Sequence, residues 1–194
     1  MSRRYVRVAL PLLLAAAACA SEGGAGLSPR GGGSNEYWFD SLPKMVATSD
    51  VVVLGTVIEL KPGDIVGEPG DEIELLDAVF DVQEVLYGSA DGSSTLTIQT
   101  DPFIPTEPEW RTIGNTVLVF MKMNTDPGSE GKFYKLNDQA VYLVTGTDVQ
   151  ETVDHDPFSN GVAAMTIDEI REKIQQAAER IAAGKVKPQP PVFG

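Results

Sequence analysis

The stretch Val51-Val-Val-Leu-Gly-Thr-Val-Ile58 decides the fold. It is short, apolar and rich in β-branched residues, which is typical of a largely buried β-strand. Gly55 in its middle predicts a bulge or a bend. Before the strand, residues 41–50 begin like a short helix. After it, residues 61–70 hold two prolines and three glycines and predict a loop.

Two further strands follow this loop. Apolar residues alternate over 76–82, which places Asp77 on the solvent side. Upstream the alternation runs in the opposite phase, so we expect a bulge near Leu75. A third strand around 95–99 alternates in the same way and puts Gln99 outside.

The second half of the chain predicts more strands and then one clear helix. Strands are expected at 115–123, 132–136 and 140–144. Thr166 and Glu169 have the spacing of a capping box at a helix start. The apolar stripe of this helix consists of Ile167, Ile170, Ile174, Ala177, Ala178 and Ile181. Short strands and a terminal helix without βαβ alternation predict a mainly β fold, a small antiparallel barrel or sandwich.

Three segments carry a family resemblance. Residues 49–57 read Ser-Asp-Val-Val-Val-Leu-Gly-Thr-Val, residues 80–88 contain Phe-x-Val-x-x-Val-Leu-x-Gly, and residues 114–120 contain Gly-x-x-x-Leu-Val-Phe. In this order and spacing they resemble strands of the bacterial relatives of the netrin/tissue-inhibitor-of-metalloproteinases (TIMP-like) OB-fold. The resemblance covers under half of the chain. It implies an OB-like antiparallel barrel of five to six strands with a C-terminal α-helix.

The chain departs from that family in its cysteines. The animal inhibitors use disulfides and a free N-terminal cysteine that chelates the zinc of a protease. Cys19 is the only cysteine here and precedes the expected domain. The resemblance therefore implies the fold and not the inhibitory chemistry.

The N-terminus is typical of a bacterial export signal. A charged segment at 1–7 precedes an apolar run at 8–18, which is about half of the roughly 20 residues that a membrane-spanning helix needs. Cys19 follows small residues, an order that resembles a lipoprotein lipobox, although Ala16 stands where leucine is usual. Cutting before Cys19 would leave a lipid on that residue, whereas cutting after Ala20 would release a soluble protein. The arginine pair near the start leaves Sec and twin-arginine export both open.

These features divide the chain into four parts. We expect a signal peptide at 1–18, a lipidated Cys19 with a flexible Gly/Ser-rich tether through residue 34, an OB-like domain at 35–183 and a disordered tail at 184–194. The tether spans roughly 20–25 Å for about 15 residues.

The expected domain is strongly acidic. Between Asn35 and Ile181 there are 27 Asp and Glu against 9 Lys and Arg. Nucleic-acid binding requires a basic face, so the count predicts no nucleic-acid partner and no electrostatic attraction to anionic lipid. It favours solubility and leaves a cationic partner or calcium as the alternative.

One loop is the candidate binding surface. Residues 101–110 hold three prolines, which limit the freedom of the loop and lower the entropy cost of binding. Phe103 and Trp110 are residue types that anchor interfaces, so we expect them to bind a partner or, alternatively, to fold down and cap the end of the barrel.

Catalytic and metal-binding patterns are sparse. His155 is the only histidine, which excludes the usual zinc sets and favours a solvated loop residue. Residues 148–156 contain four carboxylates that could form an irregular calcium site or simply a solvated acidic loop. We expect no cofactor, no metal site and no catalytic residue.

The sequence thus predicts a membrane-tethered extracytoplasmic lipoprotein. Its domain would be a non-enzymatic binding module for a protein, peptide or glycan, on the cell membrane or in the envelope. Two alternatives stay open: an envelope hydrolase that uses acidic residues, and a secreted soluble form.

Overall fold

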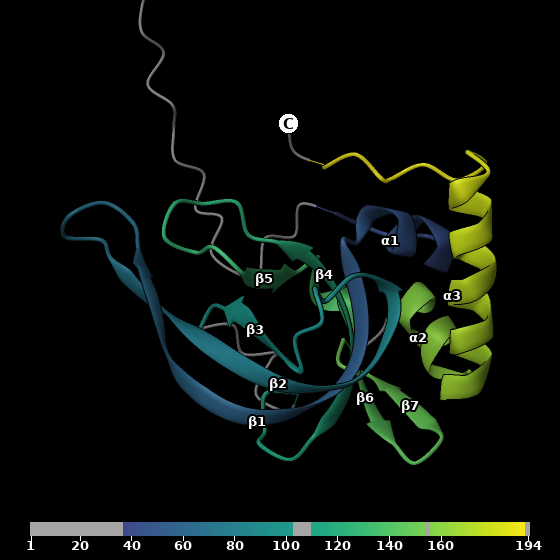
Figure 1. Ribbon diagram of the computed structural model, residues 1–194, viewed down its shortest axis with the longest axis horizontal. Helices are drawn as coiled ribbons and strands as arrows, with labels where there is room; N and C mark the ends of the chain where they lie inside the picture. Colours follow the sequence, from purple (N-terminus) through teal and green to yellow (C-terminus); the bar gives the residue numbers. More distant parts are fainter. Residues whose placement is uncertain (1–36, 103–109, 154–155, 193–194) are drawn as a thin grey trace, which may run out of the picture.

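The computed structural model describes residues 37–102, 110–153 and 156–192, and the fold is mainly β, with three α-helices in the described ranges (Figure 1). In chain order, the elements are α1 (Leu42–Thr48), β1 (Val51–Val66), β2 (Ile73–Gly88), β3 (Thr95–Thr100), β4 (Thr116–Met123), β5 (Lys132–Lys135), a 3₁₀ turn η1 (Asp138–Ala140), β6 (Val141–Thr145), β7 (Asp148–Glu151), α2 (Pro157–Ala163) and α3 (Ile167–Ala182).

Five of the strands form a ring. The sheet order is β1-β2-β3-β5-β4-β6-β7, and β1 also pairs with β4, which joins the first five strands end to end. The expected class, mainly β and OB-like with a C-terminal helix, is confirmed. The structure differs from this expectation in detail. Strands β3 and β5 pair in parallel, and β6 and β7 extend the sheet beyond β4. The ring is closed by short pairings, so it is not a true barrel.

Strand β1 is buried on both faces because two cores lie against it. Val51 and Val53 point into the ring, whereas Val52 and Leu54 point toward the helices. A side chain at Gly55 would place its Cβ 2.8 Å from the carbonyl oxygen of Asp81 on β2, and the register shifts at this glycine, as its position in the sequence predicts.

The first two strands continue beyond the ring as a long two-stranded ribbon (Figure 1). The expected loop at 61–70 is wrong for its first half, since β1 runs on to Val66. Strand pairing of β1 with β4 ends at Thr56, and Val57 still exchanges backbone hydrogen bonds with Asn115 and Gly114. Pro62, which lacks an N–H donor, lies beyond this pairing, where β1 pairs with β2 alone. The predicted bulge lies opposite Leu75.

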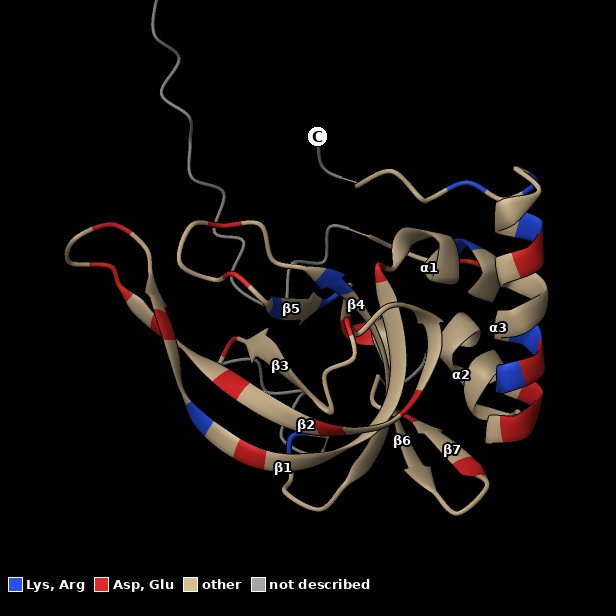
Figure 2. Ribbon diagram, viewed as in Figure 1, with Lys and Arg blue, Asp and Glu red and all other residues tan. Residues whose placement is uncertain are grey.

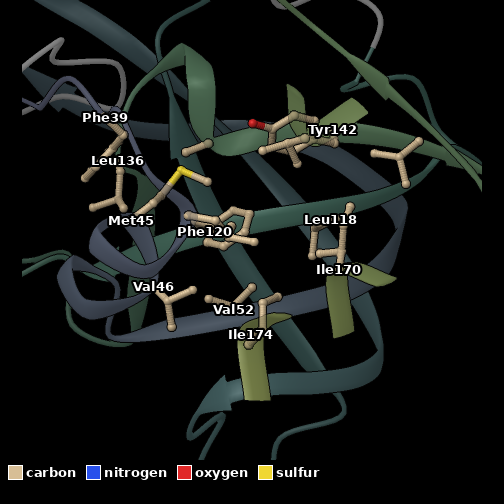
Figure 3. Packing of buried hydrophobic residues seen from close by; sticks show 14 of the residues in the cluster. Phe39, Met45, Val46, Val52, Leu118, Phe120, Leu136, Tyr142, Ile170 and Ile174 are labelled. Atoms are coloured by element: carbon tan, nitrogen blue, oxygen red, sulfur yellow. The ribbon is translucent and has the colours of Figure 1, made fainter. Parts of the chain in front are cut away.

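The helices cover the outer face of β1 and β4. In Figure 3, side chains of α1, α3 and both strands point toward one another, with Ile174 beside Val52 and Ile170 beside Leu118. The capping box of Thr166 and Glu169 is confirmed at the start of α3. The terminal helix is therefore docked on the sheet.

Candidate functional site

A groove lies between the three helices, on the side of the molecule away from the ribbon. It has a volume of about 510 Å³. Its floor is apolar, with Leu42 from α1, Phe158 from α2 and Ala177 from α3, and cationic and amide side chains of α3 stand along its wall. We call it the helix groove; its lining is Asp40, Ser41, Leu42, Pro43, Pro157, Phe158, Gly161, Val162, Met165, Lys173, Gln176, Ala177 and Arg180.

A buried glutamine holds two walls of the helix groove in place. The Gln139 side-chain carbonyl accepts a hydrogen bond from the backbone N–H of Phe39 at 2.8 Å, just before α1. Its amide nitrogen donates to Asp156 Oδ2 at 2.9 Å, at the start of α2. Because Gln139 lies in the turn η1, between β5 and β6, the sheet itself sets the distance between the two helices.

Asp156 caps the first turn of α2. Its Oδ2 accepts hydrogen bonds of 2.7 Å from both the backbone N–H and the hydroxyl of Ser159. Burial opposes ionisation of this carboxyl, but the hydrogen bonds from Ser159 and Gln139 outweigh it and hold the pKa of Asp156 below its usual value. Because Asp156 Oδ2 already accepts the hydrogen bonds of the helix cap, this oxygen is not available as a ligand for the possible calcium site at 148–156.

A second hollow adjoins the helix groove at Ser41, Pro43 and Arg180 and has a volume of about 440 Å³. Four cations and no carboxylate line it. We call it the cationic hollow; its lining is Ser41, Pro43, Lys44, Arg180, Lys185, Val186, Lys187, Pro188, Gln189 and Pro190.

Backbone geometry after α3 builds the cationic hollow. Gly184 has φ +68°, donates to the carbonyl of Ile181, and lets Lys185 donate to the carbonyl of Arg180, which is a Schellman motif. The backbone N–H of Gln189 then donates to Thr48 Oγ1 on α1 at 2.8 Å. The segment expected to be disordered is therefore described up to residue 192 and packs along α1.

The average charge of the domain conceals this cluster. Figure 2 shows Lys and Arg interspersed with Asp and Glu along α3, further blue on the segment after α3, and mostly Asp and Glu on the ribbon. Most cations elsewhere in the described ranges have carboxylate partners, for example Arg171 with Glu84 at 2.8 Å. Lys185 and Lys187 lie after Ile181 and are therefore not among the nine Lys and Arg of the acidic stretch from Asn35 to Ile181.

The residues predicted from the sequence as site residues are mostly not brought together. Cys19, Phe103 and His155 lie outside the described residues. Trp110 is 1% exposed and its ring stacks on Phe80, with centroids 6.0 Å apart, inside the ring of strands. Of the two roles considered for Trp110, packing is the one that the structure supports, because a buried ring presents no face to a partner.

A buried polar cluster at the base of the ribbon was missed by sequence reasoning. Lys132 of β5 contacts Asp64 Oδ1 at 2.7 Å and Asp77 Oδ2 at 2.9 Å. Ser129 and Gln99 donate to Asp64 as well. The predictions that Asp77 and Gln99 face solvent are wrong, since both are buried.

This cluster favours the charged form of Asp64. Burial raises the pKa of Asp64, but hydrogen bonds from Lys132 and Ser129 outweigh that effect and lower it overall. A Cβ at Gly63 would lie 2.7 Å from Asp77 Oδ1, so the ribbon backbone packs directly on the buried carboxylate. The arrangement joins the ribbon to the ring.

Comparison with known proteins assigns no relatives: no protein-family model matches the chain, and no curated protein matches it. Within residues 37–102, 110–153 and 156–192, no group of His, Cys, Asp and Glu side chains could hold a metal ion. The helices of those ranges are all too short or too polar to cross a membrane.

Proposed function

We propose that this protein is a lipid-tethered, extracytoplasmic binding module that acts without catalysis and takes a peptide segment in the helix groove. The tether is the sequence 19–34, and the anchor is Cys19. A signal peptide that ends in small residues followed by the only cysteine supports this part of the proposal.

The observation that carries the binding role is the composition of the helix groove. Ligand sites of about 300–1,000 Å³ usually combine an apolar floor with a few polar groups that fix orientation. The helix groove has this volume, and its lining combines the apolar side chains of Phe158 and Met165 with the polar ones of Lys173 and Gln176. An extended peptide would bury apolar side chains on the floor and place backbone carbonyls or carboxylates near the cationic wall.

A glycine allows the groove to be filled without disturbing the fold. Gly161 lies in α2 and lines the groove, and a Cβ built there meets no atom within 4 Å. Gly161→Phe should therefore block the groove, while replacing a helical glycine favours the helix. Gln175→Phe adds the same ring on an exposed position of α3 outside the groove and is the matched control.

The test is a selection of peptides from a displayed random library on the purified chain. We expect a common peptide pattern whose binding is lost in Gly161→Phe and kept in Gln175→Phe. If no pattern is enriched, or if both variants bind the enriched peptides equally, the groove is not the binding surface. An acid catalyst needs a carboxyl with a raised pKa, whereas hydrogen bonds lower the pKa of Asp64 and of Asp156, so neither group favours the hydrolase alternative.

A further inference from the structure

Three of the four cations of the cationic hollow lack the carboxylate partner that most cations elsewhere in the described ranges have. Arg180, Lys185 and Lys187 form no ion pair with a carboxylate in the described part of the chain, and Lys44 is held only by the exposed Asp40, at 3.0 Å. Such a cluster, in a domain with a large excess of acidic residues, produces a local positive field that attracts an anion.

Helix stability does not explain the whole cluster. The dipole of α3 favours cations at its C-terminal end, which accounts for Arg180 and Lys185. Lys44 lies instead in the first turn of α1, where the same effect disfavours a cation. Lys187 lies on the extended segment beyond the Schellman motif. Helix stability therefore leaves Lys44 and Lys187 unexplained, and of these two only Lys44 has a local partner in the described ranges, Asp40.

The hollow is also preorganised. Pro43, Pro188 and Pro190 restrict the backbone on both sides of it, and the hydrogen bond from Gln189 to Thr48 holds the segment against α1. Restricting the backbone that carries these cations lowers part of the entropy cost of binding.

We propose that the cationic hollow binds the phosphate-bearing headgroups of anionic phospholipids. Residues 41–44 line it soon after the chain enters the domain at Tyr37, so a tether of roughly 20–25 Å keeps the hollow close to the membrane surface. Trp38 is 55% exposed at this entry, and tryptophan is enriched where proteins meet membrane interfaces. Of the proposed function, this inference uses only the tether.

Screening and tethering decide whether so acidic a domain can bind this way. At physiological salt, charges more than about 8 Å away are largely screened, so the distant ribbon carboxylates contribute little. Asp40, which contacts Lys44, offsets one of the four nearby cations. Each Lys or Arg at an anionic surface raises affinity roughly fivefold. A short flexible tether supplies an effective concentration on the order of millimolar, so contacts that are weak in solution hold a tethered domain.

The experiment measures the binding to vesicles of a shortened chain that begins at Ser21, which contains every described residue and carries no lipid. Sucrose-loaded vesicles of phosphatidylcholine alone are compared with vesicles that contain equal parts of phosphatidylglycerol. Lys185→Glu is compared with Lys61→Glu, which makes the same charge change on the ribbon, and equal melting temperatures confirm that both fold. Titrations with inorganic phosphate and with polyglutamate are run at matched ionic strength.

We expect binding to the anionic vesicles only, loss of it at high salt, a decrease of roughly 25-fold in Lys185→Glu and a change below about twofold in Lys61→Glu. Equal partition into both vesicle types, or equal effects of the two variants, overturns the proposal. Saturable binding of phosphate or polyglutamate without a vesicle preference overturns it as well, in favour of a soluble anion or an acidic protein. Because no lipid anchor is present, failure here leaves the roles of Cys19 and of the helix groove untouched.

Discussion

Gln139 donates a hydrogen bond from its side-chain amide to Asp156 Oδ2 at 2.9 Å, and both residues are buried. The same side chain accepts the backbone N–H of Phe39. One amide thus joins the entry to α1 with the cap of α2, and the two walls of the helix groove are positioned by a single residue of the sheet.

Asp156→Asn tests this relationship through pH. The folded-state pKa of Asp156 is lowered, so its ionised form contributes stability above the unfolded pKa near 4, and this contribution is lost as pH falls through the folded value. Asparagine can still cap α2, but without the charge. We expect a cost of about 1 kcal/mol at pH 7 that shrinks below about pH 4.

Denaturant unfolding of wild type and Asp156→Asn from pH 7 to pH 3 measures this gap. Asp148→Asn removes an exposed carboxylate nearby and should leave stability almost unchanged. A gap that stays constant down to pH 3 would show that the charge of Asp156 does not stabilise the fold.

Lys132→Met should be strongly destabilising, because it leaves Asp77 buried and charged without its partner. Removing one member of a buried ion pair costs roughly 3–5 kcal/mol. Adding Asp77→Asn to the same chain should recover part of the loss. Chemical denaturation of the two single variants and the double variant gives the coupling, and purely additive effects would mean that the pair does not interact.

Ile174→Ala should cost roughly 2–5 kcal/mol, since this side chain is fully buried between α3 and the sheet. Gln175→Ala changes an exposed neighbour on the same helix and should stay within about 0.5 kcal/mol. The measurement is the urea concentration at the unfolding midpoint of each variant, and similar midpoints for the two variants would contradict docking of α3.

How far the sequence predicts this fold depends on the range of the interactions. Strand β1 and the cap of α3 follow from local patterns, and both are confirmed. Asp77 and Gln99 follow the alternation of outward positions, yet both are buried because partners distant in the sequence compensate their burial. Lys132 pairs with Asp77, whereas Gln99 donates to Asp64 and accepts a hydrogen bond from Asn124. No local sequence pattern predicts a partner that is distant in the sequence.

Short elements were missed for a related reason. Strand β7 and helix α2 are too short to show a period, and α2 is stabilised by the buried contacts of Asp156 rather than by its own propensity. The cationic hollow could not be predicted from the net charge of the domain, because a net charge does not say where on the surface the positive side chains cluster. Gly184 followed by Lys185 and Lys187 was the available signal, because a Schellman turn folds such a segment back on its helix.

The most direct test of the account concerns Cys19, since both the proposed function and the further inference use the tether. Express the full precursor in a bacterium with labelled fatty acid and compare wild type with Cys19→Ser, using Ser21→Ala as the control. We expect wild type and Ser21→Ala to carry the label, to begin at residue 19 by mass spectrometry and to partition into detergent, and Cys19→Ser to do none of these. A mature wild-type chain that begins at Ser21, carries no label and stays in the aqueous phase would contradict the account.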